Sequence, residues 1–317
     1  TNSHNIHIDA DGFLYVVGAM DHDIWIYNLS IPENPQLVGI WNGEYLHDIE
    51  VYNNKIYGAA IYTGYFYIID VSDKSNPYTL VSHNTGTADI STHDCAVTDN
   101  ENYLVTADET RGGHIKIWDI SDYNNINLIS EYMTHDQHSM HNVYVRPETN
   151  LVIMSHYVDG TRVLDIADPY NPVEVGFYDT SELNGLYDGN WGTYAYLPSG
   201  YIISSDRQNG LFIFSSPLTE DGLEWEPYGE TPVLTVDDVT WGAFSLQTPC
   251  VLWDEEEQRF KLWFIGYTEW IISRSGMREY TERLGYATSD DGISWDEHPD
   301  PVFESGRRPC VHKEGPG

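Results

Sequence analysis

A short phrase recurs four times in this chain, and its spacing constrains the fold more than any other feature. In each copy an apolar run ends in Asn or Asp and leads into a polar turn, which Asn-Pro closes in three of the four copies. The copies are residues 27–35, 69–77, 118–125 and 164–172. The equivalent residues Asn28, Asp70, Asp119 and Asp165 are 42, 49 and 46 residues apart. A period of about 40 to 50 residues is typical of one four-stranded β-propeller blade.

The apolar segments between the copies are short, alternate in polarity and are rich in Val, Ile, Tyr, Phe and Trp, which predicts strands. No stretch of a dozen residues keeps the period of an amphipathic helix. The predicted strands include residues 13–17, 24–27, 55–60, 65–69, 103–106, 114–118, 151–155, 161–164, 201–205 and 211–214. The exposed edge strands of a long all-β chain can pair with other chains. Arranging the sheets as blades around an axis leaves only short edges, which limits such pairing.

A second phrase begins where the first fades. Residues 219–225 return as residues 289–295, and each copy has an Asp-Gly pair followed by Trp. Asp-Gly predicts a hairpin turn, and the Trp is suited to packing between blades. The strands group into blades near residues 4–41, 46–83, 92–133, 140–180, 189–230 and 245–303, with a further strand in residues 308–313. We therefore predict an all-β fold, a β-propeller of four-stranded blades with six recognisable blades plus the first strand of a seventh.

These phrases carry a resemblance to two families. Residues 4 to about 215 resemble the LVIVD-repeat propeller of the choice-of-anchor B family, through the four turn phrases and the segment 209–214. Residues 216–317 resemble blades of arabinanase/fructosidase-like glycoside hydrolases, through the two Asp-Gly turns. The resemblance implies a single propeller over residues 1–317, with LVIVD-type blades in 4–215 and glycoside-hydrolase-like blades in 216–317, the last one incomplete.

The two families imply different functions. The first implies a secreted, surface-attached protein with no settled activity. The second implies glycan chemistry, but its catalytic carboxylates are spread over several blades, and little more than one such blade is present. No catalytic residue is therefore carried over from it.

Histidine recurs at one position near the start of the first strand of four successive blades. The residues are His4, His47, His93 and His141, spaced by 43, 46 and 48 residues. Because the first strand of a blade lines the central channel, we expect the four imidazoles to converge there. Imidazoles bind divalent metals, and sites that combine His with carboxylates suit Zn, Cu, Mn or Fe better than Ca. The spacing thus predicts a divalent-metal site.

Other polar residues are candidates for the surroundings of this site. One further candidate ligand, from the loop before His141, is His138. Residues that follow the histidines are expected to orient their rings, and residues in rim loops are expected to contact a ligand. These candidates are Asp48, Asp94, Asn142, Asp108, Glu109, Arg111 and Trp191.

Two other interpretations of the histidines remain open. Each histidine could hold the blades together by bonding the backbone of its neighbour, which would recur just as regularly. Alternatively, an imidazole without a metal could act as a general base beside a Tyr. The alternative function is a hydrolase or lyase acting on extracellular glycans, dependent either on the metal or on His and Tyr. Whether the protein is an enzyme is therefore left open.

Composition restricts the partners. The chain has 50 acidic and 15 basic residues, a formal charge of −35, which argues against binding to nucleic acid. Its apolar stretches are too short to span a bilayer, and its beginning does not read as a signal peptide. We expect a secreted or cell-surface β-propeller that binds a glycan or small molecule at one face beside the metal site. Its oligomeric state is left open.

Overall fold

The computed structural model describes residues 3–19, 23–32, 34–86, 91–197, 200–215, 218–219, 222–223, 226–227, 232–243, 245–254, 257–267, 271–272, 278–304 and 308–309. All regular elements in these ranges are β-strands, as predicted. Over the same ranges there is no helix that could cross a membrane. The chain divides into two compact units. Unit 1 comprises residues 1–156 and 162–175, and unit 2 comprises residues 157–161 and 176–317.

Four sheets of four strands follow one another along the first part of the chain, each in sequence order. The first consists of β1 (Asn5–Ile8), β2 (Phe13–Val17), β3 (Asp23–Asn28) and β4 (Gln36–Asn42). The second consists of β5 (Asp48–Tyr52), β6 (Lys55–Ala60), β7 (Tyr65–Asp70) and β8 (Tyr78–Asn84). The third consists of β9 (Thr92–Val97), β10 (Tyr103–Asp108), β11 (Ile115–Asp119) and β12 (Asn127–Tyr132). The fourth consists of β13 (Val143–Val145), β14 (Leu151–Ser155), β15 (Thr161–Asp165) and β16 (Val173–Tyr178).

Two more large sheets lie in unit 2, one of four strands and one of four strands with a fifth paired at its side. One consists of β17 (Asn190–Tyr194), β18 (Ile202–Asp206), β19 (Gly210–Ser215) and β22 (Glu226–Pro227). The other consists of β23 (Ser245–Asp254), β24 (Arg259–Tyr267), β27 (Glu282–Ser289) and β28 (Asp296–Glu297), with β29 (Phe303–Glu304) also paired to β27. These six sheets confirm the all-β propeller of four-stranded blades.

The smaller sheets of unit 2 bear on the predicted seventh blade. A hairpin is formed by β20 (Leu218–Thr219) and β21 (Gly222–Leu223), and a three-stranded sheet by β25 (Ile271–Ile272), β26 (Arg278–Tyr280) and β30 (Arg308–Pro309). Of the strand predicted in residues 308–313, only the first two residues lie within the described ranges. They pair with β26 rather than starting another four-stranded sheet.

The repeated phrase forms the turn after the third strand of each of the first four sheets. The side-chain oxygens of Asn28, Asp70, Asp119 and Asp165 accept a hydrogen bond from the backbone N–H two residues later, at 2.7, 2.9, 3.0 and 2.7 Å. The side-chain oxygen thus accepts a backbone N–H that has no partner strand once the chain has left the sheet. Turn chemistry therefore explains why the phrase recurs.

The same turn also packs against the preceding blade. Gly39 in β4 lies so close to the Lys74 carbonyl that an added Cβ would be 1.8 Å from its oxygen. Between the third and fourth blades, the Ser130 hydroxyl donates to the Pro169 carbonyl at 2.6 Å. Each contact joins a fourth strand to the turn of the following blade.

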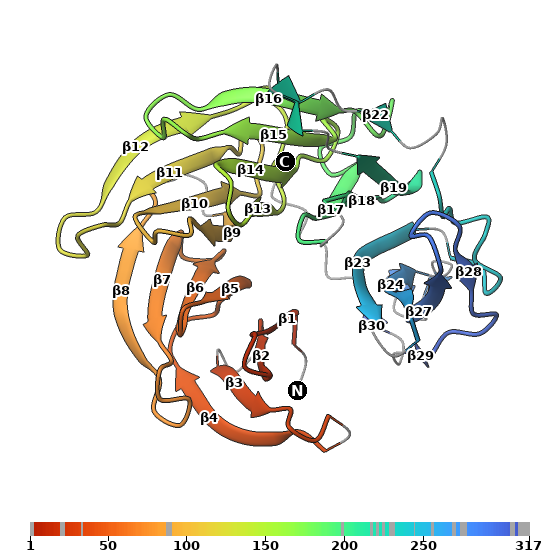
Figure 1. Ribbon diagram of the computed structural model, residues 1–317, viewed down its shortest axis with the longest axis horizontal. Helices are drawn as coiled ribbons and strands as arrows, with labels where there is room; N and C mark the ends of the chain where they lie inside the picture. The colour runs from red at the N-terminus through yellow and green to blue at the C-terminus, as the bar shows by residue number, and fades with distance from the viewer. Residues whose placement is uncertain are drawn as a thin grey trace. The chain divides into compact units, whose positions relative to one another are not determined.

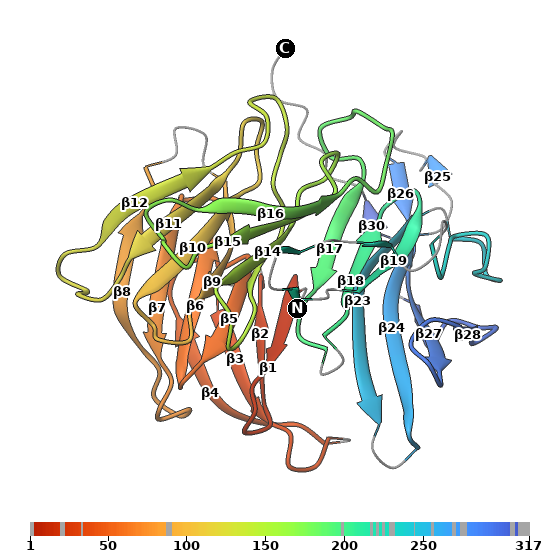
Figure 2. The ribbon, with the colours of Figure 1, turned by 45° about the horizontal axis from the view of Figure 1, so that its top comes forward.

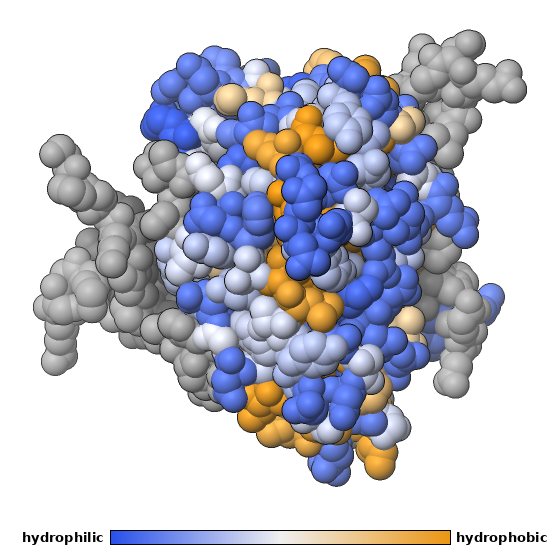
Figure 3. Space-filling view, turned by 90° about the vertical axis from the view of Figure 1, so that its left-hand side faces the viewer, coloured by the Kyte–Doolittle hydropathy of each residue, from blue (hydrophilic) through white to orange (hydrophobic). Residues whose placement is uncertain are grey.

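Apolar side chains fill the space between successive sheets of unit 1. Ile26 and Ile56 belong to a cluster shared by the first and second sheets, and Phe66 and Trp118 to one shared by the second and third. The sheets stand side by side in Figure 2, and Figure 1 shows β1, β5 and β9 on the inner side of unit 1 with β4, β8 and β12 outside. The outer face is mainly hydrophilic with separate apolar patches (Figure 3). Side chains from different blades can therefore meet in one site on these inner strands.

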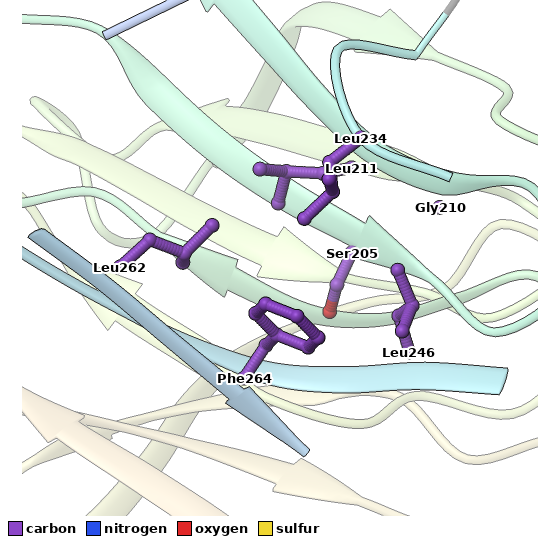
Figure 4. Close-up of a pocket in the computed structure, with 7 residues that line it drawn as sticks. All are labelled: Ser205, Gly210, Leu211, Leu234, Leu246, Leu262 and Phe264. Carbon is purple, nitrogen blue, oxygen red and sulfur yellow. The ribbon is translucent and has the colours of Figure 1, made fainter. Parts of the chain in front are cut away.

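A small cavity in unit 2 lies between its two large sheets (Figure 4). Its volume is about 10 Å³, and it is lined by Ser205, Gly210, Leu211, Leu234, Leu246, Leu262 and Phe264. This is about the space that one water molecule needs. The Ser205 hydroxyl donates to the Gly192 carbonyl, 3.4 Å away. The cavity is therefore a packing defect of the core and too small for a ligand.

Candidate metal centre

The four predicted histidines lie next to one another in unit 1. The ring centroids are 3.8 Å apart for His4 and His47, 4.2 Å for His47 and His93, and 4.2 Å for His93 and His141. Each ring is tilted by 44–49° from the next. We call these four side chains the imidazole row. The structure thus brings together the residues that the blade period predicted.

Backbone hydrogen bonds within each blade position the histidines of the row. The backbone N–H of His4 donates to the Val17 carbonyl at 2.9 Å, and that of His47 donates to the Ala59 carbonyl at 2.7 Å. His93 is part of β9 itself. Each histidine is therefore held at the end of a first strand by the second strand of the same blade.

Three residues at one end of the row form the first candidate ligand group. His93 Nε2 lies 3.7 Å from Glu109 Oε2, and His141 Nε2 lies 4.0 Å from Glu109 Oε1. One ligand atom from each of the three residues lies within 4.8 Å of the others. His93 and His141 are buried and Glu109 is half-buried. We call this the inner group.

Three residues at the other end form a second candidate group. It consists of His4, His47 and Asp48, with one ligand atom of each again within 4.8 Å of the others. His47 Nδ1 lies 3.7 Å from Asp48 Oδ2. His47 and Asp48 are buried, whereas His4 is exposed. We call this the outer group.

The surroundings of His93 are unusual for a buried imidazole. Its side chain is 1% exposed, and neither ring nitrogen has a hydrogen-bond partner. The nearest carboxylate oxygens are those of Asp48 at 3.8 Å and Glu109 at 3.7 Å. These separations exceed the roughly 2.7–3.2 Å of a hydrogen bond. Two ligands of one tetrahedral ion, each about 2.0–2.2 Å from it, lie about 3.3–3.6 Å apart. The spacing is thus close to that of groups that share an ion.

A second layer of polar side chains lies along the row. Asn142 Nδ2 donates to Asp48 Oδ2 at 3.2 Å and to Asp94 Oδ2 at 3.0 Å. Asn5 Nδ2 donates to the other oxygen of Asp48. Asp94 also accepts the backbone N–H of Val143 at 2.9 Å. These hydrogen bonds hold Asp48 beside the rings, whereas we expected from the sequence that Asp48, Asp94 and Asn142 orient the rings themselves.

Burial and neighbouring charges shift the pKa of several of these groups. Burial, and then the rings of His141 and His47, hold the pKa of His93 well below its usual range. Burial alone would raise the pKa of Asp48, but the adjacent rings of His47, His93 and His4 lower it well below its usual range. Burial, and then the Asp48 charge, raise the pKa of Asp94. A neutral His93 beside an ionised Asp48 is the protonation state that metal binding requires.

The remaining candidates make contacts other than those of the two groups. Asp108 is fully buried and pairs with Lys116 at 2.9 Å. The Arg111 side chain donates to Gln137 at 3.1 Å. His138 stacks on His135 with ring centroids 4.3 Å apart and joins neither group. Trp191 belongs to unit 2, where it packs against Tyr157 and Arg207.

Glu109 was predicted only as part of a loop wall, yet it contacts two rings of the row. The register of β10 against β9 shifts between Ala107 and Asp108, and the Glu109 N–H then donates to the Ser91 carbonyl at 2.9 Å. Such a bulge re-aims the side chains that follow it. The only sequence signal is that Asp108 and Glu109 are adjacent acidic residues at a strand end.

Together these features define a β-propeller with a histidine-lined inner edge. The model of the LVIVD repeat matches residues 45–85 and 159–180. The first match spans β5 to β8, and the second spans β15 and β16. The chain thus carries LVIVD repeats, as the turn phrases predicted.

A solved structure with the same fold is that of a protein from Lactobacillus plantarum. The two chains are 10% identical, with a TM-score of 0.63, and the alignment covers 96% of this chain and 84% of that one. At this identity the likeness concerns the fold alone. No curated protein matches the chain.

Proposed function

We propose that this protein binds a divalent transition-metal ion through the inner group of His93, His141 and Glu109. The observation that carries the proposal is the environment of His93. A buried imidazole without hydrogen bonds loses its interaction with water and gains nothing in return, at a cost of about 1–3 kcal/mol. A metal ion bound at Nε2 would compensate this loss, and the second nitrogen could then donate to a carboxylate.

The ligand set favours particular metals. Two imidazoles and one carboxylate suit Zn, Cu, Mn or Fe, whereas Ca prefers six to eight oxygen ligands. The alternative that the histidines only hold the blades together predicts a bond from each ring to a neighbouring backbone. Neither ring nitrogen of His93 makes such a bond, which supports the metal over this alternative.

Metal content tests the proposal. Protein made without a polyhistidine tag is treated with a chelator, loaded with Zn²⁺, desalted and measured by elemental mass spectrometry. We expect bound zinc in the parent and the loss of at least one equivalent in His93→Ala. The matched control is His135→Ala, because His135 is exposed and belongs to neither group. Zinc-free parent protein, or equal zinc in the parent and His93→Ala, would refute the proposal.

The wider function rests on the sequence. The LVIVD-type phrases support secretion or surface attachment of a single propeller that includes both sets of blades. The large negative charge supports an extracellular protein kept soluble by self-repulsion. We propose a glycan or small-molecule ligand at one face, beside the metal. Binding to a neutral glycan panel tests the ligand, and panels on which metal-loaded protein binds nothing would count against a glycan.

A further inference from the structure

We infer that the imidazole row holds two metal ions, one in the inner group and one in the outer group, and that contact between His93 and Asp48 couples their binding. The inference rests on the proposed function, because it requires the inner ion. It adds a second binding position and an energetic link between the two.

The outer group meets the same geometric conditions as the inner one. His47 is 9% exposed and its Nδ1 has no hydrogen-bond partner. The 3.7 Å from this nitrogen to Asp48 Oδ2 is again too long for a hydrogen bond and close to the spacing of two ligands on one ion. His4, whose ring lies beside that of His47, completes the set. This group repeats the ligand chemistry of the inner one, with two imidazoles and one carboxylate.

His93 links the two groups because its two nitrogens face different carboxylates. Nε2 faces Glu109 of the inner group, and Nδ1 lies 3.8 Å from Asp48 Oδ2 of the outer group. A histidine that binds an ion through one nitrogen donates its other N–H to a second acceptor, often a carboxylate. Asp48 is the carboxylate that this nitrogen faces, and it also belongs to the outer group. A change at Asp48 must therefore alter the inner ion as well.

Charge and burial assign different roles to the two ions. Asp48 and Glu109 supply one negative charge to each group, which partly neutralises each divalent ion. The inner group is enclosed, since His93 is 1% and His141 5% exposed at the side chain. In the outer group His4 is exposed, so water and ligands reach that ion. The outer ion is therefore the one that an external ligand can reach.

The number of zinc ions bound per chain tests whether the row holds two ions. Metal-free protein is titrated with Zn²⁺ in a non-coordinating buffer, by calorimetry and native mass spectrometry, beside variants of both groups. We expect two ions in the parent and in the control His135→Ala. One ion should remain in His4→Ala and one in His141→Ala. In Asp48→Asn one ion should remain, with an affinity about 10–100-fold weaker than that of the inner ion in His4→Ala.

The outcomes separate this inference from the proposed function. A parent that binds one ion, lost in His141→Ala and kept in His4→Ala, would retain the proposed function and overturn the pair. No ion in the parent would overturn both. Two ions, with the same remaining affinity in Asp48→Asn and His4→Ala, would overturn the coupling. Because His4 is exposed at the end of the row, His4→Ala is expected to fold even if the buried variants do not, and it then shows whether one ion is lost with the outer group.

Discussion

The side-chain amide of Asn142 lies 3.0 Å from Asp94 Oδ2, and this hydrogen bond joins the first strands of the third and fourth blades. The same amide donates to Asp48 in the second blade at 3.2 Å. One side chain therefore connects three blades beneath the imidazole row.

Asn142→Ala should lower the free energy of unfolding by about 1–3 kcal/mol, because it removes a donor from two buried carboxylates. Urea denaturation measures this change, with an unchanged slope expected. Asn127→Ala is the control, since the Asn127 side chain contacts only an exposed backbone carbonyl at 2.8 Å. Equal stability of the two variants would contradict a role for Asn142 in holding the blades.

The ion pair of Lys116 and Asp108 lies in the interior of the third blade. Lys116 also donates to the Thr85 carbonyl at 3.2 Å. Lys116→Met leaves a buried carboxylate without its cation, so we expect a loss of about 3–5 kcal/mol in unfolding free energy. The partly exposed pair of Lys261 and Asp254 is the comparison, and Lys261→Met should change stability much less than Lys116→Met does. Similar losses in both variants would show that burial does not set the cost.

Glu101 should make the stability depend on pH. Burial would raise its pKa, but hydrogen bonds from Lys55 and Asn53 outweigh burial and lower it. Because the pKa is lower in the folded chain than in the unfolded one, the interaction stabilises the fold above about pH 4.3 and is lost as the pH falls through the folded value. Glu101→Gln should cost up to about 1 kcal/mol at pH 7.

This cost should shrink as the pH falls below about 4.3 and through the lower folded pKa, because Glu101 of the parent then becomes protonated. Denaturant curves of parent and variant between pH 3 and pH 7 measure it. A difference that stays constant over this range, or grows as the pH falls, would contradict the assignment.

Gly39 has no room for a side chain. A Cβ would lie 1.8 Å from the Lys74 carbonyl oxygen, so Gly39→Ala must displace the turn of the second blade. Overpacking of this kind costs about 1–3 kcal/mol, and thermal unfolding should show it. Leu37→Ala in the same strand is the control, because Leu37 is 52% exposed and should change stability by at most about 0.5 kcal/mol. An unaffected Gly39→Ala would mean that the blades do not meet at this turn.

The blades could be predicted from sequence because their determinants are local. Asp70 and Asp119 each bond the N–H two residues ahead, so the same residue types recur wherever a third strand ends. The positions of the histidines follow from the same period. A local rule repeated at a fixed interval places equivalent residues at equivalent points of each sheet.

The contacts of Glu109 could not be predicted in this way. They depend on the bulge between Ala107 and Asp108, which changes which face of the sheet the next side chain reaches. The hydrogen bonds from Asn142 to Asp48 and Asp94 are equally non-local, because these residues are 94 and 48 positions away in the sequence. Such pairings depend on the distance between blades, which no periodicity in the sequence specifies.

The imidazole row has one further consequence, because each of the four blades in unit 1 supplies one ring from the same strand position. Duplication of a blade would copy a candidate metal ligand together with the sheet that holds it. Propellers that gain or lose a blade by recombination would then change the number of ligands in whole steps, without any new point mutation. In such a lineage the number of candidate ligands would follow the number of blades.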